Sequence, residues 1–395
     1  MQISKQVNTD MTQGSWIRKM FEAGAKLKQE FGESNVFDLS LGNPIMEPPE
    51  AFQQKLSELA KNPPPGMHRY MPNAGYKDTR EAVANNLSSE IGMDFTSEDI
   101  VMCCGAGGGL NVVLKSLLDT GDEVITISPY FVEYGYYVGN HQGLLVVCPS
   151  KHNFMPDIDQ IAKSISAKTK AILINSPNNP TGVIYPSETM HQLGVLIRAK
   201  EAELGISITL ISDEPYRKIL YDDLTYPHPF RYHNKTIVVT SHSKDLGLAG
   251  ERIGYIAIHP LFPEKATLLE ALVFCNRTLG FVNAPALMQR ITKDLQKATI
   301  DVGAYQSKRD LLYKGLIDSG YEVTWPQGAF YMFPKSPLND DVAFTEMMLK
   351  HKVLIVPGSG FGTAGYFRLS YCVEDSVIEG AISQFQKAKA LLNNA

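Results

Sequence analysis

Seven short apolar runs recur between residues 100 and 258, and most are followed by a cluster of turn-forming or polar residues. They occupy residues 100–104, 123–127, 144–148, 171–175, 206–212, 236–240 and 254–258. Runs of this length that are rich in valine and isoleucine are typical of buried strands. Strands that alternate with helices favour a mostly parallel sheet with right-handed crossovers. We therefore predict an α/β fold.

The length and composition of the chain fit an ordinary protein of two domains. It has 395 residues, of which 44% are hydrophobic and 20% charged. The net charge of −5 gives no sign of a nucleic-acid partner, and no apolar run is long enough to predict a membrane span. The N-terminal segment lacks the apolar centre of a signal peptide, and the five cysteines lack C-x-x-C spacing. We expect reduced thiols, no metal site and a cytoplasmic location.

The stretch with the strongest chemical signal is residues 240–255, T-S-H-S-K-D-L-G-L-A-G-E-R-I-G-Y, which begins where a predicted strand ends. A lysine just beyond a buried strand is costly as an ammonium unless it is paired or neutralised. A Schiff base with an aldehyde cofactor would replace the ammonium of Lys244, and Ser241, Ser243 and Arg252 are suited to holding a phosphate. The alternative is a lysine in a surface loop, and an isolated S-x-S-K pattern does not decide between the two.

Four other features fit a ligand site, although each also has an ordinary structural explanation. The glycine-rich turn at 105–109 would direct free amides towards an anion, or would simply pack closely before a helix. N-N-P-T-G at 178–182 lies where ligands bind in α/β sheets, or is a plain turn. Asp213 ends an apolar strand and needs a cation, or caps a helix. Arg368 is suited to binding a carboxylate, or lies solvated at a sheet edge.

Taken together, the motifs resemble those of the class I/II aminotransferases, fold-type-I enzymes that use pyridoxal 5'-phosphate (PLP). The similarity runs from the first helix to Arg368, and eight motifs occur in the family's order: L-G-N-P, Y-x-x-x-x-G, the turn at 105–109, P-x-F, N-P-T-G, D-x-x-Y, S-x-S-K-x-x-x-x-x-G-x-R and R-L-S. The chain departs from the family at two positions. Ser176 lies where the family usually has N-P before the N-P-T-G motif, and Pro215 lies where alanine is more common. The resemblance implies a large domain with a mostly parallel seven-stranded sheet and a smaller α/β domain.

The resemblance also implies how the cofactor is bound. Lys244 forms the Schiff base, Asp213 pairs with the pyridine nitrogen, and Tyr216 donates to the phenolic oxygen. Phe131 lies over the ring, and Asn179 contacts the phenolic oxygen and the substrate carboxylate. The remaining cofactor-binding residues of the family's pattern are Gly105, Ala106, Gly107, Ser241, Ser243 and Arg252, together with Tyr70, which reaches across a dimer interface to the partner's phosphate.

Besides Asn179, two residues are implied in binding the substrate. Arg368 binds its α-carboxylate, and Gly42, in the G-N-P turn, allows backbone amides to approach it. A dicarboxylate substrate would call for a second cation, for which Arg277, Arg231 and Arg18 are candidates that the sequence does not place.

The implied protein is a homodimer with shared active sites. Residues 1–45 form an N-terminal helix and arm that pack with the small domain, 46–285 form the large PLP-binding domain, and 286–395 form the small domain. The expected reaction is ping-pong transfer of an amino group from an L-amino acid, with aspartate or another common amino acid as donor and 2-oxoglutarate as acceptor.

Alternatives remain at this point. C–S β-lyases and aminocyclopropane-carboxylate synthases have the same constellation but eliminate rather than transfer. A catalytically inactive PLP-binding module is disfavoured because Lys244, Asp213 and Arg252 are all present. A non-catalytic PLP-binding regulator is disfavoured because no basic helix-turn-helix segment precedes the core.

Overall fold

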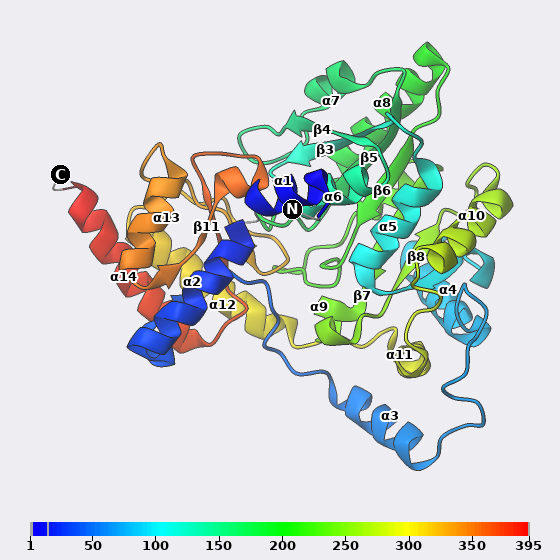
Figure 1. The fold of residues 1–395 in the computed structure, drawn as a ribbon, viewed down its shortest axis with the longest axis horizontal. Helices are drawn as coiled ribbons and strands as arrows, with labels where there is room; N and C mark the ends of the chain where they lie inside the picture. The colour runs from blue at the N-terminus through cyan, green and yellow to red at the C-terminus, as the bar shows by residue number, and fades with distance from the viewer. Residues whose placement is uncertain (1–2, 14–15, 394–395) are drawn as a thin grey trace.

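A seven-stranded sheet forms the centre of the structure, a computed structural model that describes residues 3–13 and 16–393 (Figure 1). The strand order is β2-β8-β7-β6-β5-β3-β4. Only β8 runs against its neighbours, so the mostly parallel sheet is confirmed. The strands are β2 (Ile100–Cys103), β3 (Glu123–Ser128), β4 (Leu144–Pro149), β5 (Thr169–Asn175), β6 (Thr209–Asp213), β7 (Thr236–Ser241) and β8 (Gly254–Ile258).

Helices cover both faces of this sheet, which explains why its strands are apolar on both sides. Side chains alternate along β5, so that Leu173 packs in the core beneath α5 and α10 while Ile172 packs against α8. Full burial of each such side chain contributes about 1.5–3 kcal/mol. The helices of this part are α4 (Lys77–Ile91), α5 (Gly105–Leu117), α6 (Glu133–Asn140), α7 (Ile158–Ser164), α8 (Ser187–Leu204) and α10 (Lys265–Thr278).

The C-terminal third carries two small sheets. The antiparallel order β11-β12-β9 places β12 in the middle, and β1 pairs in parallel with β10. The N-terminal α2 contacts β11 and lies in the same half of the molecule as the C-terminal helices (Figure 1). The elements are α2 (Trp16–Phe31), β1 (Phe37–Asp38), α12 (Val302–Asp318), β9 (Tyr331–Met332), α13 (Asp341–Lys350), β10 (Val353–Leu354), β11 (Val356–Pro357), β12 (Phe367–Ser370) and α14 (Asp375–Asn393). Helix α11 (Ala286–Thr292) packs instead against α4. The division at residues 45 and 285 stays a prediction.

The remaining elements are short or stand apart from the sheets. No helix among residues 3–13 and 16–393 is long and apolar enough to cross a membrane. The α-helices are α1 (Lys5–Gln13), α3 (Glu50–Lys61) and α9 (His242–Asp245), and the 3-10 helices are η1 (Glu33–Asn35), η2 (Ser97–Asp99), η3 (Pro229–Arg231), η4 (Ala249–Glu251), η5 (Lys293–Leu295) and η6 (Gly358–Phe361).

The predicted turn at 105–109 is wrong, because α5 already begins at Gly105. The glycines serve close packing rather than a turn. A Cβ on Gly109 would lie 2.6 Å from Cγ1 of Val239 in β7, so only glycine allows α5 to approach the sheet this closely. The apolar run at 353–357 is divided between β10 and β11, which belong to different sheets.

Candidate active site

A cavity of about 320 Å³ lies at the carboxyl ends of β5, β6 and β7, where parallel sheets commonly bind ligands. Twelve of the predicted site residues line it: Gly42, Ala106, Gly107, Phe131, Asn179, Asp213, Tyr216, Ser241, Ser243, Lys244, Arg252 and Arg368. Gly105 lies next to the cavity, against Arg252. Tyr70 lies elsewhere and is 90% exposed, so the single chain does not bring it to the site.

Lys244 lies in α9, directly after β7, and its Nζ donates to the carbonyl oxygen of Gly42 at 2.8 Å. Burial lowers the pKa of Lys244 to about 8, and Arg252 and Arg368 act in the same direction. A buried amine with a lowered pKa has a larger neutral fraction at neutral pH, and the neutral amine is the form that attacks a carbonyl group. The interpretation as a surface-loop lysine is therefore wrong.

Asp213 ends β6 and is 5% exposed. Its Oδ2 accepts a hydrogen bond from the hydroxyl of Tyr134 at 2.6 Å, whereas its Oδ1 has no partner. Burial raises the pKa of Asp213 to about 7. The carboxylate is therefore costly as it stands, and a cationic donor at Oδ1 would relieve that cost. Sequence reasoning missed Tyr134, although it lies in the aromatic segment that follows Pro129.

A cradle for an anion lies at the start of α5. The hydroxyls of Ser241 and Ser243 are 3.0 Å apart, and the first turn of the helix supplies the amides of Ala106 and Gly107. A Cβ on Gly105 would come within 2.7 Å of Nη2 of Arg252, so the glycine makes room for the guanidinium group.

Arg368 lies on β12 and is 2% exposed, so the solvated-edge interpretation is wrong. Its Nη1 donates to Oδ1 of Asn179 at 3.1 Å, and its Nη2 donates to the carbonyl oxygen of Ser40. The guanidinium carbon lies 4.8 Å from the ring centroids of both Tyr331 and Phe361. A guanidinium that is fixed by neighbours on several sides is well placed to bind a carboxylate.

Tyr331 is a cavity residue that sequence reasoning did not identify. Its hydroxyl lies 3.0 Å from that of Tyr216. A Cβ on Gly42 would lie 1.9 Å from the Tyr331 hydroxyl, so one reason for the glycine is the space that this tyrosine needs. No local motif marks Tyr331, because strand β9 brings it to the site from a distant part of the chain.

The candidates for a second carboxylate-binding cation do not converge on the cavity. Arg277 lies against the ring of Phe274 at 5.6 Å, and Nη2 of Arg231 donates to the carbonyl oxygen of Ile91. The side chain of Arg18 lies outside the part of the structure that is described. Within the described chain, the cations that line the cavity are Lys244, Arg252 and Arg368.

These groups fit a single ligand. The unpaired Oδ1 of Asp213 matches a protonated ring nitrogen, the cradle at α5 matches a phosphate, and the amine of Lys244 matches an aldehyde. PLP carries all three groups. Fold and site together define a PLP-dependent transferase of fold type I.

Comparison with known proteins gives the family. The profile described as aminotransferase class I and II matches residues 34–385, and the chain belongs to this family of PLP-dependent transaminases. A relative named "Probable aspartate aminotransferase", from Methanocaldococcus jannaschii, is 32% identical over 363 residues, 88% of this chain and 92% of the relative. An aminotransferase structure from Eubacterium rectale is 38% identical with a TM-score of 0.96, over all of both chains. Aspartate aminotransferase from Thermus thermophilus, solved with maleate, is 28% identical with a TM-score of 0.87, over 98% of this chain and all of the other.

Proposed function

We propose that this transaminase moves an amino group from an L-amino acid to a 2-oxo acid by a ping-pong mechanism, with Lys244 as the residue that binds PLP covalently. The observation that carries the proposal is that Lys244, Asp213 and Arg368 open into one cavity. When bound, PLP supplies a ring that withdraws electrons from the substrate Cα and carries the amino group between the two half-reactions.

The residues of the chain divide the remaining work. Arg368 holds the substrate α-carboxylate and thereby directs Cα towards Lys244. Nζ of Lys244 would accept and return the proton at the substrate Cα, a task that suits an amine whose pKa burial has lowered to about 8. Asp213 keeps a proton on the ring nitrogen, and Tyr216 donates to the phenolic oxygen.

The other assignments complete this proposal. Phe131 lies over the ring, and Asn179 contacts the phenolic oxygen and the substrate carboxylate. The phosphate is held by the cradle residues Gly105, Ala106, Gly107, Ser241, Ser243 and Arg252. Tyr70 acts across the interface of a homodimer with shared sites, which agrees with its exposure in the single chain.

We further propose aspartate and 2-oxoglutarate as the substrate pair. One relative is named an aspartate aminotransferase, and the Thermus thermophilus structure was solved with maleate, which is a dicarboxylate. Since the described cavity holds no cation beyond Lys244, Arg252 and Arg368, this preference depends on the relatives.

A screen of amino donors against 2-oxoglutarate and pyruvate tests the proposal, with the change in cofactor absorbance as the readout. Beyond the one amino group that each bound PLP can accept, a transaminase consumes one molecule of acceptor for every molecule of donor that it converts to an oxo acid. A β-lyase would instead release pyruvate and ammonia from a cysteine conjugate without any acceptor, and that result would overturn the proposal. Aspartate that reacts no faster than phenylalanine or alanine would overturn the substrate assignment alone.

A further inference from the structure

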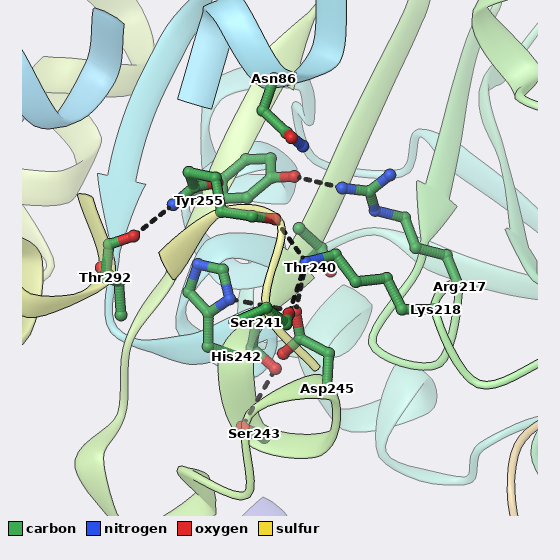
Figure 2. A network of polar contacts seen from close by, with 12 residues as sticks. Asn86, Arg217, Lys218, Thr240, Ser241, His242, Ser243, Asp245, Tyr255 and Thr292 are labelled. Carbon is green, nitrogen blue, oxygen red and sulfur yellow. Dashed lines mark hydrogen bonds and ion pairs between the residues drawn. The ribbon is translucent and has the colours of Figure 1, made fainter. Parts of the chain in front are cut away.

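A second polar cluster is made of Lys218, His242 and Asp245 (Figure 2). None of the three lines the cavity, but Ser241 and Ser243, next to His242 in the chain, do. Oδ2 of Asp245 lies 3.2 Å from Nζ of Lys218 and 3.2 Å from Nδ1 of His242. Asp245 is 6% exposed and His242 is 3% exposed. Nζ of Lys218 also donates to the carbonyl oxygen of Gln296 at 2.7 Å. We call these three residues the Asp245 cluster.

The Asp245 cluster fixes the helix that carries Lys244. Helix α9 has only four residues, too few to be stable without tertiary contacts. Its two ends are held by backbone hydrogen bonds, from the amide of His242 to the carbonyl of Ile253 and from the amide of Ile300 to the carbonyl of Asp245. The side chain of Asp245 adds the ion pair to Lys218. Lys218 follows the segment of Asp213 and Tyr216, so the cluster joins the two loops that carry the proposed catalytic groups.

Stability alone is a poor explanation for this ion pair. Removing two charges from water costs about as much as their attraction returns. Oδ1 of Asp245 and Nε2 of His242 have no partner, which makes the cluster still less favourable. Although burial opposes ionisation, His242 and Lys218 hold the pKa of Asp245 at about 2, so the carboxylate stays charged at every working pH.

We propose that Asp245 is a positioning residue for Lys244. Its ion pair with Lys218 fixes the position of the Lys244 side chain, and it also sets how readily Nζ of Lys244 keeps a proton when it is linked to the cofactor. This inference rests on the proposed covalent role of Lys244. Because the two charges of the pair are opposite, removing one or the other must shift that ionisation in opposite directions.

Other charged or titratable groups face the same nitrogen or the Asp245 cluster, and the variants leave them in place. Those that face Lys244 or line the same cavity are Asp213, Tyr137, Tyr216, Arg252, Tyr331, Arg368 and Cys372. Those that face the cluster are Glu214, Arg217 and Tyr255.

The test is a pH titration of the cofactor absorbance in the holoenzyme and in three variants. The midpoint of this titration is the pH at which the cofactor-linked nitrogen of Lys244 has lost half of its proton. In Asp245→Asn the positive charge of Lys218 is no longer balanced, so this midpoint should fall by about half a pH unit. In Lys218→Met the negative charge of Asp245 remains, so the midpoint should rise by about the same amount. The double variant should lie between the two. We also expect kcat of Asp245→Asn to fall about tenfold with little change in KM, because the lysine is displaced but the Arg368 site is intact.

Asp99→Asn is the matched control. Asp99 lies in η2, is fully buried and pairs with Lys265 at 2.6 Å, and neither residue lines the cavity. It should lower the thermal midpoint without moving the absorbance midpoint. Midpoints of Asp245→Asn and Lys218→Met that do not move, or that move in the same direction, would overturn the proposal. If Asp245→Asn does not fold, Lys218→Met alone tests the proposal. An absorbance midpoint of Lys218→Met that is lowered or unchanged would then reject the proposal. Wild-type protein in which borohydride fixes no cofactor on Lys244 would refute the proposed function instead.

Discussion

The two ends of the cavity are built in different ways. The cofactor end comes from residues that end or follow strands of one sheet or open the helix beside it, such as Asp213 at the end of β6 and Ser241 at the end of β7. The substrate end combines segments that lie far apart in the chain, namely the loop of Gly42, the turn of Asn179, and the paired strands β9 and β12.

The two ends also differ in how well their polar groups are paired. At the substrate end, Nη1 of Arg368 is already bonded to Asn179 and Nη2 to Ser40, and only Nε has no partner. At the cofactor end, Oδ1 of Asp213 is buried without a partner. A cofactor that pairs with Oδ1 of Asp213 removes the desolvation cost of a buried, unpaired oxygen, which suits a group that stays bound. A substrate must instead replace hydrogen bonds that Arg368 already makes, which suits a molecule that must also leave.

Lys244→Ala should have the largest effect, because Lys244 serves both ends. We expect PLP to remain bound without a protein-linked absorbance, and turnover to fall by about a thousandfold or more, since the variant loses both the covalent link and the proton carrier. Single-turnover assays and absorbance spectra measure the two effects. Lys293→Ala, a change at an exposed ion pair with Asp78, is the control. Undiminished turnover in Lys244→Ala would reject the assignment.

Asp213→Asn tests the cofactor end alone. The amide keeps the shape of the side chain but cannot hold a proton on the ring nitrogen, so kcat should fall by about a hundredfold. Substrate KM should change little because Arg368 is untouched. Steady-state kinetics with a fixed acceptor measures both values. A change in KM alone would show that Asp213 acts on the substrate and not on the cofactor.

Arg368→Lys tests the substrate end alone. A lysine keeps the charge but loses the two parallel hydrogen bonds, so kcat/KM should fall by about thirtyfold for donor and acceptor alike. PLP affinity, measured by fluorescence of the reconstituted protein, should stay within about twofold of wild type, because the cofactor end is unchanged. A loss of PLP affinity larger than the loss in kcat/KM would show that the two ends are not separable.

This contrast also decides how much of the site was predictable. The structure brings the residues of the cofactor end to one cavity, as the family resemblance implied, and most of them stand beside a strand end that the sequence marks with valine and isoleucine runs and with glycine or serine. Parallel strands bring such ends to one edge of the sheet without any knowledge of the tertiary structure. The same pattern predicts a mostly parallel sheet, whereas neither the strand order nor the antiparallel direction of β8 follows from it.

What escaped prediction depends on tertiary contacts. Tyr331 and Tyr134 are ordinary aromatic residues in the sequence, and only packing shows that one meets Tyr216 and the other meets Asp213. The glycines at 105–109 favour a turn by their local preference, yet the close approach of α5 to β7 makes them helical. The ion pair of Lys218 with Asp245 joins two loops whose contact no spacing predicts.

The smallest effect that we predict is a pH dependence at Lys244, where the two ends meet. Burial lowers the pKa of its ammonium from the ordinary value to about 8, so the neutral amine forms at lower pH than in a solvated lysine. The rate of covalent PLP attachment to the apoprotein should therefore rise about tenfold per pH unit below pH 8 and level off above it. Stopped-flow absorbance with excess PLP measures this rate. A solvated lysine would give a rate that still climbs near pH 10, and that result would mean that the cavity does not shield the amine from water.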